Sequence, residues 1–569
     1  MTHSTPDTPK LSAVEGMKVE SRQLRGTILE DLANPDTGAL SEASYQLLKF
    51  HGIYEGYNRD TATSRKKQGL DKEYEFMARI RIPAGRLTAA QYLRLDELAD
   101  DYSNGTLRIT TRQAIQYHCI LKKDLWSTIH EINKAQLSTI SACGDVVRNI
   151  TSSPAPIRDV VHNTLREVVD TLVPEVEPKS TAYADIWING EQHKEFKEVK
   201  EVEEPLYGKT YLPRKFKIGV ATPEDNSVDV LTNDLAIIAL FNGQTLEGFN
   251  LALGGGLGMT HNKPETYPYI AKPIVFVTKE QLIDAVKAVI KMQRDHGDRT
   301  NRKHARLKYL VAEKGVEWVK AGVEEQFGAP LPPARPVAQY TVVDHMGWHE
   351  QGDGLLYLGL PISSGRIHDT ATQKIRTGLR EVVQKYGVDP ILTPNQDIIL
   401  SNIKPADKVA IEALLRAHNL TFASDMSVVS RWAMACPALP TCGLALTEAE
   451  RVKEPMVASI EAEMQKFNLQ NENISIRITG CPNGCARPYA GEIGLVGRQP
   501  GFYALYLGGD FEGTRLNQRV LDKVPEANIA ATLGKAFALY STQQQSQESF
   551  GDFCHRLGAE ALKTALEAA

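Results

Sequence analysis

Alternating apolar and polar residues between positions 74 and 83 predict a β-strand that carries Arg79 and Arg81 on its polar face. Residues 91–102 then place apolar side chains at helical spacing, which predicts an amphipathic helix. A second strand is predicted over residues 107–118. Together the three segments form one strand–helix–strand unit.

The same unit recurs later in the chain. Residues 360–367 parallel residues 82–87, a helical stretch follows over residues 375–386, and residues 391–398 parallel residues 108–115. Such a repeat predicts two related α/β halves that pack about a pseudo-twofold axis with a site between them. The alternative is a chance similarity between two amphipathic segments.

The rest of the chain is arranged around these two halves. A polar, Pro/Thr-rich stretch at the N-terminus has little to bury and is expected to be disordered. We expect the following division: a disordered tail (1–20), an N-terminal arm (21–73), two half-domains (74–139 and 339–420), a middle domain (140–338) and a C-terminal domain (421–569).

The overall composition excludes several classes of protein. A net charge of −5 and a pI near 6.3 argue against a general nucleic-acid binder. The longest apolar run, residues 235–241, is too short to cross a membrane, and the N-terminus lacks an apolar targeting segment. Seven cysteines are too few for a disulfide scaffold, so Cys119, Cys143 and Cys554 are interpreted as ordinary thiols of a soluble cytoplasmic protein.

The other four cysteines form two short clusters. Cys436 and Cys442 are spaced C-x5-C, and Cys481 and Cys485 are spaced C-x3-C after 38 intervening residues. Converging thiolates repel one another unless a metal centre takes up their charge. Zinc sites usually use tighter cysteine pairs, so these longer loops favour a cubic iron–sulfur cluster. A structural zinc site and four unrelated core cysteines are the alternatives.

Several cations point to an anion site. Lys215 and Lys217 share one face of a strand entry, where two ammonium groups repel unless they serve an anion, and Arg148 follows a turn of small residues. Residues 253–258 form a glycine-rich run that lets backbone amides approach an anion, although a flexible loop explains it equally well. The basic residues between 294 and 308 are typical of a solvated helix surface unless a polyanionic cofactor lies beside them.

At Thr479-Gly480-Cys481-Pro482-Asn483-Gly484-Cys485 the chain resembles the siroheme-dependent sulfite and nitrite reductases, especially the haemoprotein (beta) subunit of bacterial assimilatory sulfite reductase. The resemblance extends from about Ser21 to about Phe553. It implies an α+β fold: duplicated ferredoxin-like halves, a middle α/β domain and a C-terminal domain that binds a [4Fe-4S] cluster and siroheme. The four cysteines would hold the cluster, and Cys485 would also ligate the siroheme iron.

The resemblance also assigns the remaining site residues. Substrate-binding cations would be Arg81, Arg148, Lys215 and Lys217. Contacts to the rim of siroheme would come from Arg112, Gln116, His118, Lys303, Arg306 and Asn483. Siroheme carries eight carboxylates, so its pocket needs many donors.

The implied activity is six-electron reduction of sulfite to sulfide for sulfate assimilation and cysteine biosynthesis. Nitrite reductases of the family tend to have Asn where this chain has Lys217, which favours sulfite. The implied electron donor is an NADPH-dependent flavoprotein subunit, with ferredoxin as the alternative. A ferredoxin-dependent nitrite reductase and a non-catalytic iron–sulfur or zinc protein are the competing interpretations.

Overall fold

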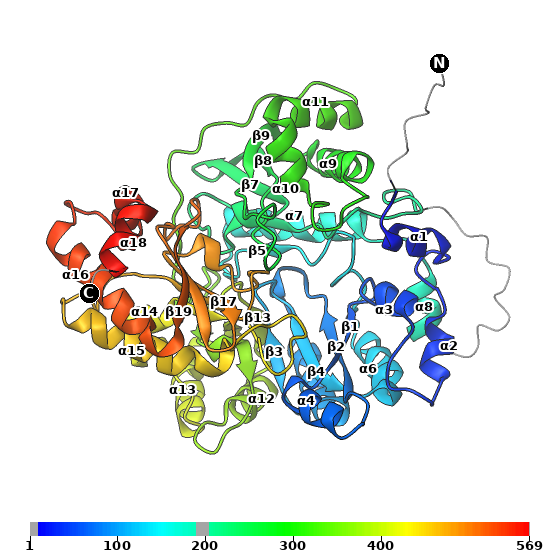
Figure 1. The fold of residues 1–569 in the computed structure, drawn as a ribbon, viewed down its shortest axis with the longest axis horizontal. Helices are drawn as coiled ribbons and strands as arrows, with labels where there is room; N and C mark the ends of the chain where they lie inside the picture. Colours follow the sequence, from blue (N-terminus) through cyan, green and yellow to red (C-terminus); the bar gives the residue numbers. More distant parts are fainter. Residues whose placement is uncertain (1–9, 189–203, 568–569) are drawn as a thin grey trace.

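A computed structural model describes residues 10–188 and 204–567 and contains helices packed around four β-sheets (Figure 1). The N-terminal arm consists of helices α1 (Ala13–Glu20), α2 (Ile28–Ala33) and α3 (Glu42–Leu48). Disorder up to residue 20 is wrong from Ala13 onward, because Glu15 and Lys18 of α1 are buried and paired at 2.6 Å. Residues 1–9 of the expected tail lie outside the described residues. Among the described residues, no helix is both long enough and apolar enough to cross a bilayer.

The first half-domain contains the predicted strand–helix–strand unit. Its helix buries Tyr92, Leu95 and Leu98, as the apolar spacing predicted. The predicted strand over 107–118 is interrupted by a turn at which Gln113 has a φ of 50°. The elements are β1 (Ile53–Tyr57), α4 (Arg59–Lys67), β2 (Tyr74–Ile80), η1 (Pro83–Gly85), α5 (Ala89–Tyr102), β3 (Leu107–Ile109), β4 (Ile115–Ile120) and α6 (Lys122–Lys134).

The second half-domain repeats this order and exchanges contacts with the first. Arg366 and Ile367 form a short strand that pairs with β3, and Arg86 makes the reciprocal bridge to Ile391. A Cβ at Gly85 would lie 2.3 Å from the Leu392 carbonyl oxygen, so only glycine allows this close approach. The elements are β10 (Gly347–Glu350), β11 (Leu356–Leu360), η4 (Ser363–Gly365), β12 (Arg366–Ile367), α12 (Ile375–Tyr386), β13 (Asp389–Leu392), β14 (Ile398–Ile403), η5 (Pro405–Asp407) and α13 (Lys408–Ala417).

The middle domain contains one five-stranded sheet of order β5-β6-β7-β8-β9, whose first two pairings are parallel and last two antiparallel. Helices α9 and α11 pack against each other, and α11 also contacts β9, beside this sheet (Figure 1). The elements are β5 (Thr151–Ser152), α7 (Val160–Val176), α8 (Ala182–Trp187), β6 (Ile218–Ala221), η3 (Val230–Thr232), β7 (Leu235–Asn242), β8 (Thr245–Leu253), β9 (Lys272–Val277), α9 (Leu282–His296), α10 (Leu307–Lys314) and α11 (Val316–Phe327).

The C-terminal domain has a sheet of the same design, with order β15-β16-β17-β18-β19 and the same sequence of parallel and antiparallel pairings. It has an apolar core of its own, separate from the core that the other domains share. The elements are η6 (Ala423–Asp425), α14 (Val428–Arg431), β15 (Ala433–Ala435), η7 (Glu450–Val452), α15 (Lys453–Gln465), β16 (Ile476–Thr479), η8 (Pro488–Ala490), β17 (Ile493–Gln499), β18 (Phe502–Leu507), β19 (Gln518–Pro525), η9 (Glu526–Asn528), α16 (Ile529–Gln543), α17 (Phe550–Leu557) and α18 (Ala559–Glu567).

The duplication therefore extends beyond the two half-domains. Strand register makes Gly219 of β6 equivalent to Arg477 of β16, because each lies opposite corresponding residues of its neighbouring strands. A short 3₁₀ turn follows at the same distance in both copies, η3 after β6 and η8 after β16. The middle and C-terminal domains are thus two copies of one unit, as the two half-domains are.

Candidate functional site

The four cysteines lie where two neighbouring parallel strands end. Cys436 directly follows β15, and Cys481 lies two residues beyond the end of β16. Because β15 and β16 are parallel, their carboxyl ends meet at one edge of the sheet. The Gly480 N–H donates to the Cys436 Sγ at 3.3 Å, and a Cβ on Gly480 would lie 2.6 Å from the Thr447 carbonyl oxygen. Sheet topology therefore joins cysteines that are far apart in sequence.

The four thiols act on one another electrostatically. Burial raises the pKa of Cys436 well above its usual value, and Cys485, Cys481 and Cys442 raise it further. Burial, together with Cys485 and Cys442, raises the pKa of Cys481 to about 12. Such a set becomes four thiolates only when a metal centre supplies positive charge. Within the described ranges no group of three His, Cys, Asp or Glu side chains is placed to hold a single metal ion.

Three hydrogen bonds fix the loop that carries Cys481 and Cys485. The Tyr489 hydroxyl and the Met259 N–H each donate to the Pro482 carbonyl oxygen at 2.9 Å. The Thr111 hydroxyl donates to the Cys485 carbonyl oxygen at 2.9 Å. The Cys485 residue itself is exposed, so its side chain can reach a ligand outside the C-terminal domain. The first half and the middle domain both hold this loop.

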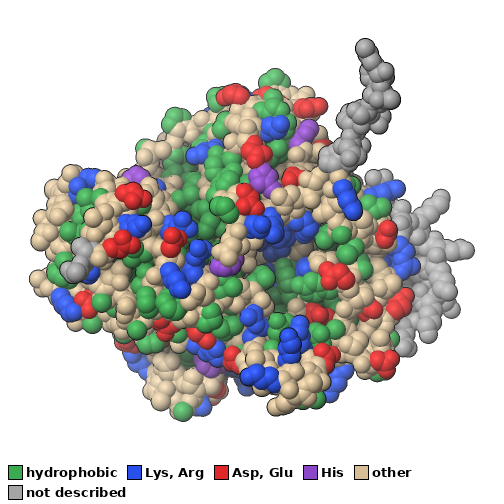
Figure 2. Space-filling view, in the orientation of Figure 1, with side chains coloured by type: hydrophobic (Ala, Val, Ile, Leu, Met, Phe, Trp, Pro, Cys, Tyr) green, Lys and Arg blue, Asp and Glu red, His purple; other side chains and the backbone are tan. Residues whose placement is uncertain are grey.

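A cluster of cations lies beside this loop, on the first half and the middle domain. Lys215 and Lys217 flank Phe216 at the entry to β6, and Phe216 is buried in the core, so both lysines face away from it. Burial lowers the pKa of Lys215 well below its usual value, and Arg214, Arg148 and Lys217 lower it further. Near the centre of the face in Figure 2, Lys and Arg side chains gather in a hollow. We define the cation cluster by the residues whose charges act on one another: Arg79, Arg112, Arg148, Lys215 and Lys217.

One buried carboxylate, that of Asp234, lies next to the cation cluster. Asp234 accepts a hydrogen bond from the Lys217 backbone N–H at 2.9 Å and forms a buried ion pair with Arg306 Nη2 at 2.6 Å. Burial and the positive charges of Arg112 and Arg306 lower the pKa of Lys217 to about 7, although Asp234 opposes the shift. A lysine of this kind binds an anion when protonated and can release a proton near neutral pH.

The structure places Arg79, rather than Arg81, in the cation cluster. The Arg79 Nη1 atom donates to the Cys143 Sγ at 3.0 Å, and its Nη2 lies 2.6 Å from the Gln116 amide oxygen when that amide is turned toward it. Arg81 lies beyond the end of β2 and pairs with Glu177 at 2.8 Å. Sequence alternation places both arginines on the same face of the predicted strand. In the structure the strand ends at Ile80, so Arg79 lies on it and Arg81 lies beyond it. Arg148, Lys215 and Lys217 lie in the cluster.

Three of the predicted rim residues, Arg112, Gln116 and His118, belong to the first half-domain. Gln116 and His118 are buried on β4, and His118 Nε2 has no hydrogen-bond partner within the described structure. The Arg112 guanidinium bonds the Asn233 amide oxygen at 2.5 Å and the Ile218 carbonyl oxygen at 3.0 Å, which ties the first half to β6. Its pKa falls to about 9, chiefly because it is buried. Arg112 belongs to the cation cluster and follows Thr111, which contacts the cysteine loop, and Gln116 lies beside Arg79 of the cluster.

Arg306, Lys303 and Asn483 have different surroundings. Arg306 is held by Asp234, and Lys303 is exposed at the surface. Lys308, the last residue of the basic run between 294 and 308, donates to the Gly258 carbonyl oxygen at 2.8 Å and orders the glycine-rich run. A Cβ on Gly258 would lie 3.2 Å from the Asn483 carbonyl oxygen, so the run packs against the cysteine loop. Its glycines serve this close packing.

These residues suit a polyanionic macrocycle that is held between the cysteines and the cations. Five cations act on one another with Asp234 as the main acidic neighbour, so the region carries excess positive charge. Arg112 Nε is a buried donor without a partner among the described residues, of a kind that a carboxylate would satisfy, and His118 Nε2 is a second buried polar atom without a partner there. The donor set therefore fits siroheme.

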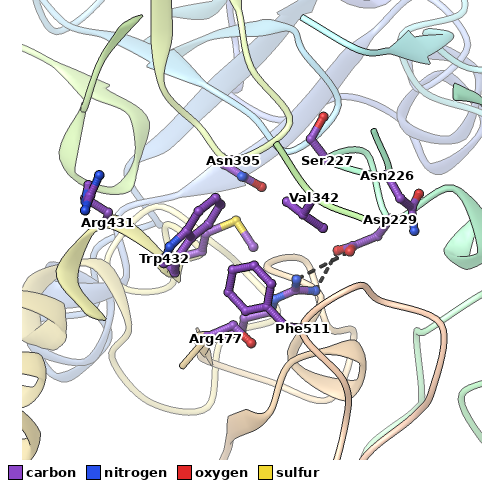
Figure 3. Close-up of a pocket in the computed structure, with 11 residues that line it drawn as sticks. Asn226, Ser227, Asp229, Val342, Asn395, Arg431, Trp432, Arg477 and Phe511 are labelled. Atoms are coloured by element: carbon purple, nitrogen blue, oxygen red, sulfur yellow. Dashed lines mark hydrogen bonds and ion pairs between the residues drawn. The ribbon is translucent and has the colours of Figure 1, made fainter. Parts of the chain in front are cut away.

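The opposite side of the pseudo-twofold axis provides an internal comparison. By the register of the repeats, Cys485 corresponds to Ser227, Lys217 to Ser475, Arg112 to Asn395 and Arg148 to Arg431. These four counterparts line a small cavity with Trp432 and Phe511 (Figure 3). There Arg431 is neutralised by Asp344 at 2.8 Å. The thiol and the free cations are thus confined to one of the two related sites.

A duplicated α+β fold with four converging thiols and an adjacent cation cluster defines the class of iron–sulfur redox enzymes that act on small anions. Residues 169–331 and 429–569 match the nitrite and sulphite reductase 4Fe-4S domain, and residues 68–135 and 349–418 match the nitrite/sulfite reductase ferredoxin-like half domain. The chain belongs to the nitrite and sulfite reductase family. The predicted duplicated ferredoxin-like fold is confirmed.

Known relatives cover almost the whole chain. It is 45% identical to the sulfite reductase [NADPH] hemoprotein beta-component of Myxococcus xanthus, in an alignment that covers 96% of this chain and 97% of that protein. It is 43% identical to the sulfite reductase [ferredoxin] of Synechococcus elongatus, in an alignment that covers 97% of this chain and 90% of that protein. The solved structure of Mycobacterium tuberculosis NirA is similar in fold, with a TM-score of 0.78 over 98% of each chain at 23% identity.

Proposed function

We propose that this chain reduces sulfite to sulfide by six electrons at a coupled siroheme and [4Fe-4S] centre, in the cytoplasm, for sulfate assimilation and cysteine biosynthesis. The four cysteines would hold the cluster, and Cys485 would be shared with the siroheme iron. When bound, the two groups would pass electrons from the external donor to the substrate. The chain's own residues would bind the anion, neutralise the siroheme carboxylates and provide protons.

One observation carries this proposal: the cation cluster lies next to the loop of Cys485. Thr111 bonds the Cys485 carbonyl oxygen, and the adjacent residue, Arg112, is a member of the cluster. Sulfite reduction removes three oxygens as water, so protons are needed beside the substrate. Lys217, whose pKa is about 7, is suited to deliver them.

Sulfite is favoured over nitrite by the charge of the pocket. Arg79, Arg148, Lys215 and Lys217 surround one region, and a strongly cationic pocket suits a dianion better than a monoanion. Nitrite reduction by the same centre is the alternative activity. Relatives named as sulfite reductases in both NADPH-type and ferredoxin-type forms support the choice of sulfite.

The electron donor is proposed to be an NADPH-dependent flavoprotein subunit, with ferredoxin as the alternative. The surface beside Cys442 suits a small acidic carrier. Leu444 is 66% exposed, and Arg59 at the start of α4 donates to the Gly443 carbonyl oxygen at 2.8 Å. The last turn of α4 is basic, with Lys66 and Lys67 exposed. An acidic partner that docked here would approach the cluster through its most exposed loop.

The deciding experiment is steady-state turnover of the cofactor-loaded chain with a reduced viologen dye, which needs no natural donor. We expect kcat/KM for sulfite to exceed that for nitrite, with sulfide as the product. A preference for nitrite would overturn the choice of substrate. Iron and labile-sulfide analysis of the same sample tests the class, because zinc without sulfide would indicate a non-catalytic binding protein.

A further inference from the structure

The loop that carries Cys485 has a counterpart in the middle domain. Asp229 and Arg487 follow the equivalent residues Gly219 and Arg477 at the same distance in sequence. Both have left-handed backbone, with φ of 46° and 56°, and each directly precedes a 3₁₀ turn. A left-handed conformation is uncommon for residues other than glycine. Asp229 and Arg487 are therefore the same structural position in the two copies.

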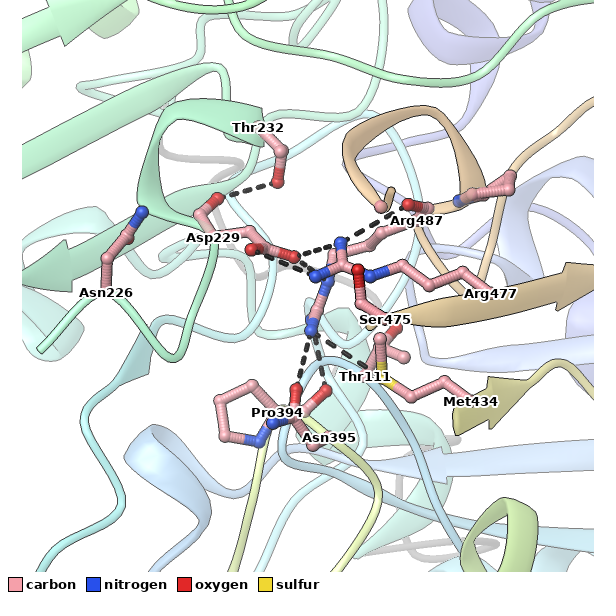
Figure 4. A network of polar contacts seen from close by, with 12 residues as sticks. Thr111, Asn226, Asp229, Thr232, Pro394, Asn395, Met434, Ser475, Arg477 and Arg487 are labelled. Carbon is pink, nitrogen blue, oxygen red and sulfur yellow. Dashed lines mark hydrogen bonds and ion pairs between the residues drawn. The ribbon is translucent and has the colours of Figure 1, made fainter. Parts of the chain in front are cut away.

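These two equivalent residues meet each other. Arg487 Nε lies 2.6 Å from Asp229 Oδ2, and Arg477 Nη1 lies 2.6 Å from the same oxygen (Figure 4). All three side chains are buried. One carboxylate thus holds two guanidinium groups at the contact between the two copies, in surroundings where each charge depends on its partner.

Arg487 also reaches the second half-domain. Its Nη1 donates to the Pro394 carbonyl oxygen at 3.0 Å, and its Nη2 donates to the Asn395 amide oxygen at 2.9 Å (Figure 4). Pro394 and Asn395 lie in the turn between β13 and β14, which corresponds to the turn between β3 and β4 in the first half. Arg487 therefore joins two segments: its ion pair reaches Asp229 of the middle domain, and its two Nη atoms donate to the turn between β13 and β14.

The corresponding turn of the first half holds the same loop from its other side. Thr111, the counterpart of Pro394, donates to the Cys485 carbonyl oxygen at 2.9 Å. The two pseudo-equivalent turns thus form hydrogen bonds with the cysteine loop at positions two residues apart, one at Cys485 and one at Arg487. Since Cys485 is exposed, the direction of its side chain depends on how its backbone is fixed. The clamp formed by Thr111, Asp229, Asn395 and Arg487 provides that fixation.

We propose that Arg487, oriented by Asp229, is a positioning residue that sets the direction in which Cys485 presents its sulfur to the two metal centres. The proposal rests on the function proposed above. Groups that orient metal ligands affect a centre without touching it, and their loss typically lowers activity about 10–100-fold. Arginine is required because its planar fork serves several acceptors at once, whereas lysine offers a single charged point. A mere domain contact would not affect the electronic properties of the centre.

Arg487→Lys in the full, cofactor-loaded chain tests this proposal, because the substitution keeps the positive charge beside Asp229. We expect iron, labile sulfide and siroheme contents close to those of the wild type. We also expect an altered electron paramagnetic resonance spectrum of the coupled centre and a shifted reduction potential. With viologen as donor, kcat should fall about tenfold while KM for sulfite changes less than about threefold.

Arg431→Lys is the matched control, since Arg431 pairs with Asp344 in the cavity of Figure 3 and is not a member of the clamp. If Arg487→Lys fails to fold, Asn395→Ala removes one acceptor of Arg487 and should cause a smaller change of the same kind. The inference about Arg487 would be overturned, without affecting the proposed function, if the loaded Arg487→Lys chain had the same spectrum and reduction potential as Arg431→Lys. If Arg487→Lys does not fold, the same comparison is made with Asn395→Ala. A wild-type chain that takes up neither cluster nor siroheme would overturn the proposed function as well.

Discussion

The backbone N–H of Lys217 donates to the carboxylate of Asp234 at 2.9 Å, and this contact fixes the strand entry from which the Lys217 ammonium extends. The same contact recurs in the second copy, where the Ser475 N–H donates to Glu492 at 2.9 Å. Asp234 is paired with Arg306, whereas burial raises the pKa of Glu492 to about 8. Both copies therefore have the same backbone hydrogen bond to a carboxyl group. The carboxylate of Asp234 is ion-paired, in the copy that holds the cation cluster, whereas the raised pKa of Glu492 favours its neutral form.

Lys217→Met should lower activity and raise the stability of the cofactor-free chain. Burial lowers the pKa of Lys217 from 10.5 to about 7, so below pH 7 both folded and unfolded chains are protonated there and the full cost of burying the charge is present. Between about pH 7 and 10.5 only the unfolded chain holds that proton, and the cost declines as the pH rises. We expect the variant to be more stable by about 1–3 kcal/mol at pH 6, with the difference vanishing near pH 10.

Urea unfolding at several pH values measures this difference. Lys303→Met is the control, because Lys303 is exposed and should show little dependence on pH. A gain in stability that stays constant from pH 6 to pH 10 would contradict the lowered pKa. In the loaded enzyme the same Lys217→Met change should reduce kcat/KM for sulfite by about 100-fold, the usual loss when one charged donor is removed from an anion site.

Arg79→Ala and Arg81→Ala form a pair that separates the two arginines. Arg79 lies in the cation cluster, so its loss should lower kcat/KM for sulfite by about 100-fold. Arg81 makes a largely buried ion pair with the partly exposed Glu177 (relative exposures 10% and 32%), and its loss should cost about 1 kcal/mol of stability with kcat/KM nearly unchanged. Viologen-driven turnover and thermal unfolding distinguish the two outcomes, and an inactive Arg81→Ala chain that remains folded would restore the prediction made from sequence.

Sequence reasoning singled out four cysteines that the sheet topology brings together, three cations that lie in one cluster, and the repeat of the half-domains, because each has a local pattern. It missed the second duplication because the copies diverged where function differs: Cys485 corresponds to Ser227, and Lys217 to Ser475. Arg81 was assigned from the family resemblance, and periodicity could not correct that choice, because Arg79 and Arg81 have the same strand phase. Arg487 was not singled out either, because its partners Asp229, Pro394 and Asn395 are distant in sequence.

Cys485→Ser should fold and lose the coupled centre. The residue is exposed, and its link to Thr111 uses the backbone carbonyl oxygen, which the substitution retains. A serine hydroxyl is a poor replacement for a thiolate ligand, so labile sulfide and turnover should both fall sharply. Cys119→Ser is the control, because Cys119 lies on β4 beside Asn104, apart from the four clustered thiols. Full activity in Cys485→Ser would contradict the assignment of the shared ligand.

The basic end of α4 gives a prediction about the electron donor. Lys66 and Lys67 are exposed on the helix whose first residue, Arg59, contacts the Cys442 loop. Reversing both charges (Lys66→Glu with Lys67→Glu) should slow reduction by an acidic flavoprotein or ferredoxin about tenfold at low ionic strength. Turnover with viologen should change less than about twofold, because that dye needs no docking surface.

The ionic-strength dependence distinguishes docking from damage. Added salt screens charges beyond about 8–10 Å, so a docking defect should shrink as salt slows the wild-type reaction toward the rate of the variant. Lys385→Glu with Lys404→Glu changes the net charge equally on the second half-domain and should leave donor-driven turnover unaffected. If both double variants lose the same activity with the protein donor, net charge controls the encounter and α4 is not the docking element. If only the α4 variant is impaired, electrons enter through the Cys442 side of the cluster.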